Sequence, residues 1–161
     1  MEEIKFSTGK QEFRLNDQVS VSFNPTDAAF VERIYDVFEK LDAEQQTYRS
    51  EMDACADKRK IFDIARQHDE KMREMIDGLF EAPVCAALFG SMNVYALADG
   101  LPVWANLMLA ILDQVDATMT REKLRTNPRI QKYTERWAKK QKTAGMFRME
   151  YPRRMKNLKE W

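Results

Sequence analysis

The first 23 residues alternate apolar and polar side chains, which is the pattern of half-buried β-strands. Three such runs follow one another: Ile4 and Phe6, then Phe13 and Leu15, then Val19, Val21 and Phe23. A two-residue loop at Gly9-Lys10 would pair Phe6 with Phe13, and glycine in the first position suits a type II′ turn. These runs predict antiparallel strands joined by short loops.

The second loop decides the register, because a slip of one residue moves every side chain to the other face of the sheet. A two-residue loop at Asn16-Asp17 would set Leu15 opposite Gln18, on the wrong face. A three-residue loop, 16–18, pairs Leu15 with Val19 and, further along, Phe13 with Val21. We therefore predict a three-stranded meander with one apolar face, which needs helices to pack on.

A helix is predicted to begin after this meander. Asn24 is a suitable N-cap, Pro25 would take the first helical position, and Asp27 suits the positive end of the helix dipole. No further Gly or Pro occurs until Gly78.

Apolar residues then recur at alternating spacings of four and three, as in a coiled coil. The stripe comprises Phe30, Ile34, Val37, Leu41, Tyr48, Cys55, Phe62, Ala65, Met72, Ile76 and Leu79, with polar exceptions at Glu44, Glu51, Lys58 and Asp69. Its phase survives the charged stretch 57–60, which favours one long helix. Typical helices are far shorter, so a break near Asp57 remains the alternative.

Shorter elements are predicted downstream. Pro83 can start a helix that Gly90 or Asn93 ends, 99–102 is a turn, and Pro102 opens an apolar helix through 115. Asn127-Pro128 would start a basic helix to about residue 142, ended by Gly145, and 146–161 is expected to be loosely ordered when free. The expected fold is α+β, mostly α, with residues 1–120 as meander plus helical body and 121–161 as basic helix and tail.

Charge is divided unevenly along a chain whose net charge is zero. Residues 118–161 hold 14 basic and 4 acidic side chains, a net +10, which leaves −10 on residues 1–117. Such asymmetry suggests a nucleic-acid partner, an acidic protein partner, or docking of the basic segment on a neighbouring copy. We expect a homo-oligomer, and we expect no nucleic-acid partner because the acidic body opposes DNA.

The composition also bears on the cellular compartment. Cys55 and Cys85 are too few for a disulfide framework and are expected to be reduced core residues. The acidic, polar start of the chain lacks the apolar region of a secretory signal. The most apolar stretch, 83–112, is interrupted too often to reach the roughly 20 apolar residues that span a bilayer, so no membrane association is expected.

Catalytic motifs are absent from the sequence. It contains no Gly-rich phosphate loop, G-x-S-x-G, H-E-x-x-H or C-x-x-C motif. The single histidine, His68, lies in a charged stretch and is expected to be an ordinary surface residue. Asp99, Asp113 and Asp116 could form a carboxylate pair, but solvated acids are the simpler interpretation. We expect no enzymatic activity, no cofactor and no bound metal.

The basic segment holds the candidate partner-binding residues. They are Arg129, Lys132, Tyr133, Arg136, Trp137 and Lys140, with Lys139 beside them. A solvated helix that packs Trp137 on its own body is the alternative. A second apolar group is expected to be core, although it could line a groove for a partner helix; it comprises Phe89, Met92, Tyr95, Leu97 and Trp104.

Two stretches carry a resemblance to a known class of proteins. They are FNPTDAAFV at 23–31, and LFGSMNVY through DGLPVWANL between 88 and 107. At these residues the chain resembles tail assembly chaperones of long-tailed bacteriophages and prophages of Gram-positive gut bacteria, which are encoded between the tail-tube and tape-measure genes. The resemblance covers about residues 12–115 and not the basic C-terminal segment.

The resemblance implies a non-enzymatic factor in the cytoplasm of the host bacterium. Such chaperones coat the long, helical tape-measure protein, help to recruit tail-tube subunits, tend to self-associate and are absent from the finished virion. The expected partner is therefore the tape-measure protein or another tail protein. Two alternatives remain open: a structural tail component, and a DNA- or RNA-binding regulator that uses residues 121–161.

Overall fold

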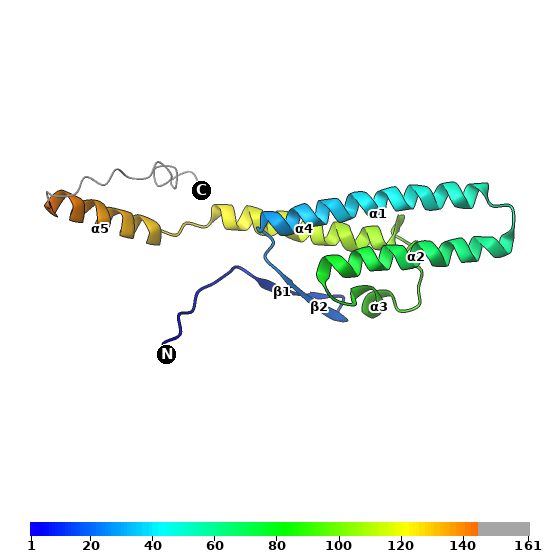
Figure 1. Ribbon diagram of the computed structural model, residues 1–161, viewed down its shortest axis with the longest axis horizontal. Helices are drawn as coiled ribbons and strands as arrows, with labels where there is room; N and C mark the ends of the chain where they lie inside the picture. The colour runs from blue at the N-terminus through cyan, green and yellow to red at the C-terminus, as the bar shows by residue number, and fades with distance from the viewer. Residues whose placement is uncertain (145–161) are drawn as a thin grey trace. The chain divides into compact units, whose positions relative to one another are not determined.

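A computed structural model describes residues 1–144, which are mostly helical (Figure 1). The elements are β1 (Gln11–Leu15), β2 (Val19–Phe23), α1 (Ala28–Ala54), α2 (Lys58–Phe80), α3 (Val84–Phe89), β3 (Leu97–Ala98), β4 (Leu101–Pro102), α4 (Val103–Leu124) and α5 (Arg129–Ala144). The chain divides into two units, Met1–Met119 and Thr120–Trp161. The predicted end at Gly145 and the tail after it lie outside the described residues.

The β1–β2 hairpin confirms the predicted register. Leu15 pairs with Val19 and Phe13 with Val21. Asn16 and Asp17 both have positive φ, at 47° and 56°, a conformation that Asn and Asp tolerate better than most residues. The three-residue loop therefore keeps the apolar residues of both strands on one face.

The prediction of a third strand in the meander is wrong. Within the described residues the N-terminal sheet has two strands, and Ile4 and Phe6 are 88% and 82% exposed. Asn24 Nδ2 donates a hydrogen bond of 2.8 Å to the Thr8 carbonyl. That bond leads residues 1–8 past the open end of the hairpin, so they do not fold back on β1.

The start of α1 also differs from the prediction. Asp27, not Asn24, is the N-cap, and its side chain accepts a 3.0 Å bond from the Ala29 N–H. Asn24 instead accepts bonds from the backbone and hydroxyl of Thr26. Its side chain is thus used in the turn before the helix, and Pro25 is buried there.

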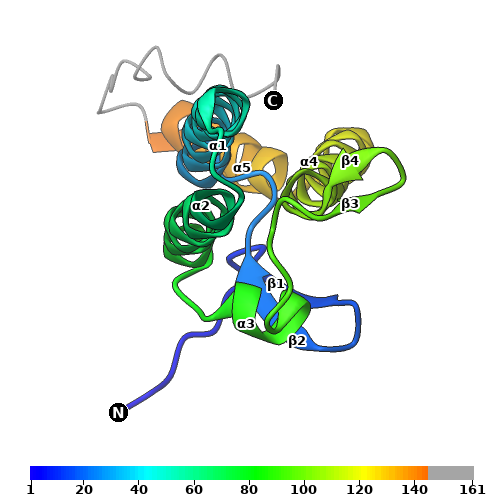
Figure 2. The same ribbon diagram turned by 90° about the vertical axis from the view of Figure 1, so that its right-hand side faces the viewer.

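The prediction of one long helix through 57–60 is wrong. α1 ends at Ala54, residues 55–57 are not helical, and α2 runs back beside α1 (Figures 1 and 2). Asp57 has extended φ and ψ and caps α2 by accepting a 2.9 Å bond from the Arg59 N–H. The connection is three residues, close to one helical turn, so the apolar stripe keeps its phase across the reversal.

The other helices and turns begin and end near the Pro, Gly and Asn residues that were predicted to mark them. α3 lies between Pro83 and Gly90, and Asp99-Gly100 forms the turn of the short β3–β4 pair. α5 starts after Asn127, whose side chain accepts a 3.1 Å bond from the Arg129 N–H. No described helix has the length and apolar character required to traverse a lipid bilayer.

The core of the first unit joins the hairpin to its helices. Val21 and Phe23 of β2 are buried, and the Phe23 ring stacks between those of Phe13 and Phe30 at 4.6 and 4.4 Å. Other buried apolar residues of α1, α2, α3 and α4 are Ile34, Leu41, Met72, Ile76, Val84, Cys85, Met108, Ile111 and Val115.

Three of the predicted core positions are solvent-exposed. Tyr95 and Trp104 are buried and Phe89 packs against the core, but Met92 and Leu97 are exposed, as is Phe62 of the stripe. Met92 lies in the loop after α3 and Leu97 in β3, where a short hairpin offers no second layer to cover them. Cys85 is a buried free thiol, and Cys55 is a half-buried one.

Candidate functional site

His68 is buried between α1 and α2, which corrects its prediction as a surface residue. Only 2% of the residue is exposed. Its Nδ1 lies 2.6 Å from Glu44 Oε1, and its Nε2 lies 2.8 Å from Glu51 Oε2. The Nδ1 contact is close but lacks the geometry of a hydrogen bond, whereas the Nε2 contact is a hydrogen bond.

Two tyrosines complete this His68 cluster, which we define as Glu44, Tyr48, Glu51, His68 and Tyr95. The Tyr48 ring stacks on Tyr95 at 4.0 Å and meets the His68 ring edge-on at 5.6 Å. Burial, and then the negative charge of Glu44, raise the pKa of the Tyr95 phenol above its usual value. The phenol therefore stays neutral. The cluster sets one buried histidine ring between the carboxylates of two glutamates.

Three other polar side chains of α2 form hydrogen bonds with the backbone of α3 and of the loop after it. Asp69 accepts a 2.8 Å bond from the Val94 N–H, and Arg73 donates to the Gly90 and Met92 carbonyls at 2.9 and 2.6 Å. One turn further, Asp77 accepts a 2.9 Å bond from the Cys85 N–H. These three side chains fix α3 and its following loop against α2.

The chemistry open to the His68 cluster is limited by its burial. A substrate has no access to a ring that is 2% exposed, and both ring nitrogens already face carboxylates. The described residues contain no group of three or more His, Cys, Asp or Glu side chains arranged to bind a metal ion. The arrangement is suited to holding α1 against α2.

A hollow of about 600 Å³ lies where the hairpin meets the helices. Lys10, Asp27, Arg33 and Glu81 contribute charges of both signs to its lining. Asp27 is already engaged as the cap of α1. The Arg33 guanidinium lies over the Phe30 ring at 5.6 Å. Two of the four charged side chains in the lining, Asp27 and Arg33, are thus already engaged within the chain.

α5 carries all six residues predicted to bind a partner. Ile130, Tyr133 and Trp137 fall at spacings of three and four, so they share one helix face. Tyr133 and Trp137 are 59% and 56% exposed. We call Ile130, Tyr133 and Trp137 the aromatic stripe of α5.

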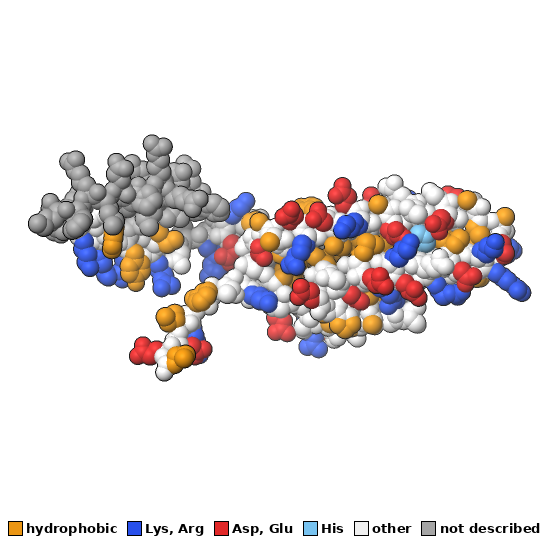
Figure 3. Space-filling model, viewed as in Figure 1, with side chains coloured by type: hydrophobic (Ala, Val, Ile, Leu, Met, Phe, Trp, Pro, Cys, Tyr) orange, Lys and Arg blue, Asp and Glu red, His pale blue; other side chains and the backbone are white. Residues whose placement is uncertain are grey.

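Positive charge borders this stripe. Arg129, Lys132 and Arg136 are exposed, and the Arg136 guanidinium lies 5.8 Å from the centre of the Tyr133 ring. Lys139 and Lys140 are also exposed. Figure 3 shows apolar and basic side chains side by side on the described part of α5. Aromatic and arginine residues that share an exposed surface are typical of binding hot spots.

The sequence contains a signal for the His68 cluster. Glu44 and Glu51 are two of the polar exceptions in the apolar stripe, and Tyr48 lies between them at the same helical face. Polar residues at predicted core positions require polar partners. A histidine at a facing position would have been the natural partner, but only a helix reversal near residue 57 brings it there.

Comparisons with known proteins returned no match: no family model, no curated protein and no solved structure is similar to this chain.

Proposed function

We propose that this chain is a non-enzymatic tail assembly chaperone of a long-tailed bacteriophage. It acts in the cytoplasm of the host bacterium and binds the tape-measure protein or another tail protein through α5. The observation that carries the proposal is the aromatic stripe of α5, with Tyr133 and Trp137 more than half exposed among basic residues.

An aromatic stripe of this kind suits a helical partner. Tyr and Trp supply large contact areas at small cost in conformational entropy, and an amphipathic helix binds through residues spaced three and four apart. The basic residues beside the stripe would select an acidic partner surface and accelerate its association. A tape-measure protein, being long and helical, offers many such surfaces.

The test uses the full chain and the tape-measure protein of the same genome, produced together and purified through a tag on one of them. Tyr133→Ala/Trp137→Ala should weaken binding at least tenfold, because hot-spot aromatics each contribute about 2 kcal/mol or more. Gln131→Ala is the matched control, since Gln131 lies about a third of a turn away from Trp137. Equal binding by wild type and double variant would refute the proposal.

Separate experiments test the two alternative functions, a structural tail component and a nucleic-acid-binding regulator. A structural tail component would be found in purified virions by mass spectrometry, whereas a chaperone would be absent from them. The exposed Arg129, Lys132 and Arg136 also favour a nucleic-acid-binding regulator as second candidate. That function requires a change in the fluorescence anisotropy of labelled DNA or RNA that weakens steeply with salt.

A further inference from the structure

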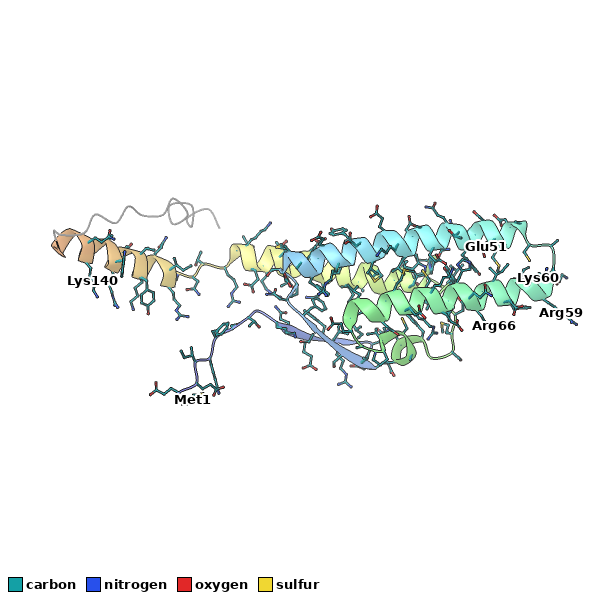
Figure 4. All side chains as sticks on the ribbon, in the orientation of Figure 1. Met1, Glu51, Arg59, Lys60, Arg66 and Lys140 are labelled. Atoms are coloured by element: carbon teal, nitrogen blue, oxygen red, sulfur yellow. The ribbon has the colours of Figure 1, made fainter. Side chains whose placement is uncertain are left out.

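The N-terminal segment has the pattern of a strand but no strand to pair with. We call residues 1–8 the arm. Ile4 and Phe6 alternate with polar residues, yet both side chains are almost fully exposed. No backbone–backbone hydrogen bond within the described residues involves the arm. Figure 4 shows Met1 at its far end, away from α1 and α2 of the same unit.

The junction between arm and hairpin is built to direct the arm outward. Gly9 has a φ of +72°, and a Cβ added there would lie 2.6 Å from Asn24 Nδ2. Only glycine lets Asn24 come this close and bond to the Thr8 carbonyl. The Ser7 and Thr8 hydroxyls accept bonds from the Gly9 and Lys10 N–H groups. These bonds hold the arm off its own β1.

The hairpin, for its part, lacks a third strand. β2 lies beside α3 (Figure 2), and its Val21 and Phe23 are buried. On β1 the corresponding Phe13 and Leu15 are only half-buried, because no strand among the described residues pairs with the other edge of β1. The outer edge of β1 therefore has backbone groups available for pairing and an apolar face that is incompletely covered.

The arm matches this edge in length and in pattern. The eight residues of the arm, if extended, span about 26 Å, and the five residues of β1 span about 17 Å. Ile4 and Phe6, two residues apart, would lie on the same face as Phe13 and Leu15. Addition of a strand to an exposed edge obtains affinity from backbone bonds and specificity from alternate side chains.

We propose that the arm of one copy adds as a third strand to the outer edge of β1 in a second copy. Each copy then gives one arm and accepts one, so either a closed pair or a larger ring satisfies every arm. Ile4 and Phe6 become covered by the second copy, and Phe13 and Leu15 gain the neighbour they lack. This interface is separate from the aromatic stripe of α5 and does not depend on the proposed chaperone function.

The test measures the mass of the full chain by light scattering over a series of concentrations. Ile4→Ser/Phe6→Ser should weaken self-association at least about a hundredfold, since burial of each large apolar side chain contributes strongly to binding. Glu3→Ser/Lys5→Ser is the matched control, because it changes the same arm, removes one charge of each sign and leaves the apolar residues intact. It should assemble as wild type does.

Hydrogen exchange locates the contact. In the wild-type oligomer, the alternate amides of residues 2–8 that face β1 should exchange slowly, and in Ile4→Ser/Phe6→Ser they should exchange rapidly. High salt should leave the assembly intact, which separates it from association driven by the charged residues of α5.

Three results would overturn the proposal. The first is a wild-type chain that stays monomeric at every concentration, and the second is a double variant with the wild-type mass. The third is a melting temperature of the double variant below that of the wild type at a dilution at which both are monomeric, which would mean that Ile4 and Phe6 pack on their own chain.

Discussion

The His68 cluster and the aromatic stripe of α5 break the hydrophobic pattern in opposite directions. In the first, a polar ring lies inside: His68 is buried and faces Glu44 and Glu51 across the α1–α2 interface. In the second, large rings lie outside, with Tyr133 and Trp137 more than half exposed. A buried polar group and an exposed aromatic ring are both unfavourable without a partner. The two regions obtain their partners from different molecules.

A buried polar group has to find its partners within the chain, because water cannot reach it. Every partner of His68 is accordingly supplied by the same unit. An exposed aromatic ring needs no partner for folding, so it can be reserved for another molecule. Changes in the His68 cluster should therefore act on stability, and changes in α5 should act on binding.

The largest effect is expected for His68→Ala. Removal of the ring leaves a cavity between α1 and α2 and takes away the buried partner of Glu44, whose side chain is 20% exposed, so the free energy of unfolding should fall by about 3 kcal/mol. Urea denaturation followed by circular dichroism measures this change. Glu74→Ala, at an exposed position of α2, is the control and should change stability by less than about 0.5 kcal/mol. A loss below about 1 kcal/mol for His68→Ala would contradict a structural role.

A smaller loss is expected for Trp104→Phe. Trp104 Nε1 donates a buried 2.8 Å hydrogen bond to Gln45 Oε1, and phenylalanine would leave that oxygen without its donor. The free energy of unfolding should fall by about 1–2 kcal/mol. Trp104→Phe/Gln45→Leu, measured in the same urea titration, should recover part of the loss. No recovery would mean that the indole acts through packing alone.

Cys85 tests whether the interior beside α2 is closed to water. Burial, and then the adjacent Asp77, raise the pKa of its thiol from 9.0 to about 12. An unfolded thiol loses its proton near pH 9, whereas the folded one keeps it, so the folded state binds more protons between pH 9 and 12. Stability should therefore fall as pH rises through this window, by about 1 kcal/mol near pH 10.

Cys85→Ala should lack this part of the pH dependence, which a comparison of urea midpoints at pH 8 and about pH 10 measures. In the native wild-type chain, a thiol reagent should react with the half-buried Cys55 and spare Cys85. Equal reaction of both thiols, or an unchanged pH dependence in Cys85→Ala, would show that the interior opens to solvent.

The smallest effect on folding is expected for Tyr133→Ala/Trp137→Ala. Both rings are exposed, so the free energy of unfolding should change by less than about 0.5 kcal/mol. Thermal and urea denaturation of the double variant check this. A larger loss would show that Trp137 supports its own fold, and the contrast with His68 would disappear.

Local sequence signals predicted much of the fold. The register of β1 and β2 followed from alternation and loop length, because each strand buries one face. Pro83 and Gly90 marked the ends of α3, and Asn127 marked the start of α5, because caps act within one helical turn. The six candidate residues of α5 share one element as predicted, although their role in binding stays a prediction.

The sequence by itself therefore determined the features that depend on neighbours along the chain. These are the stretches that are helical, the register of the hairpin and the uneven distribution of charge. Tertiary structure alone decided three things. The chain reverses at residues 55–57 because α1 and α2 bury their stripes against each other, which a preserved heptad phase cannot reveal. The arm leaves β1 because Asn24 donates a hydrogen bond to the Thr8 carbonyl, and these two residues are sixteen positions apart in the sequence. His68 is buried because that reversal brings it to Glu44 and Glu51, and an effect of this kind depends on distance in space, which sequence spacing does not encode.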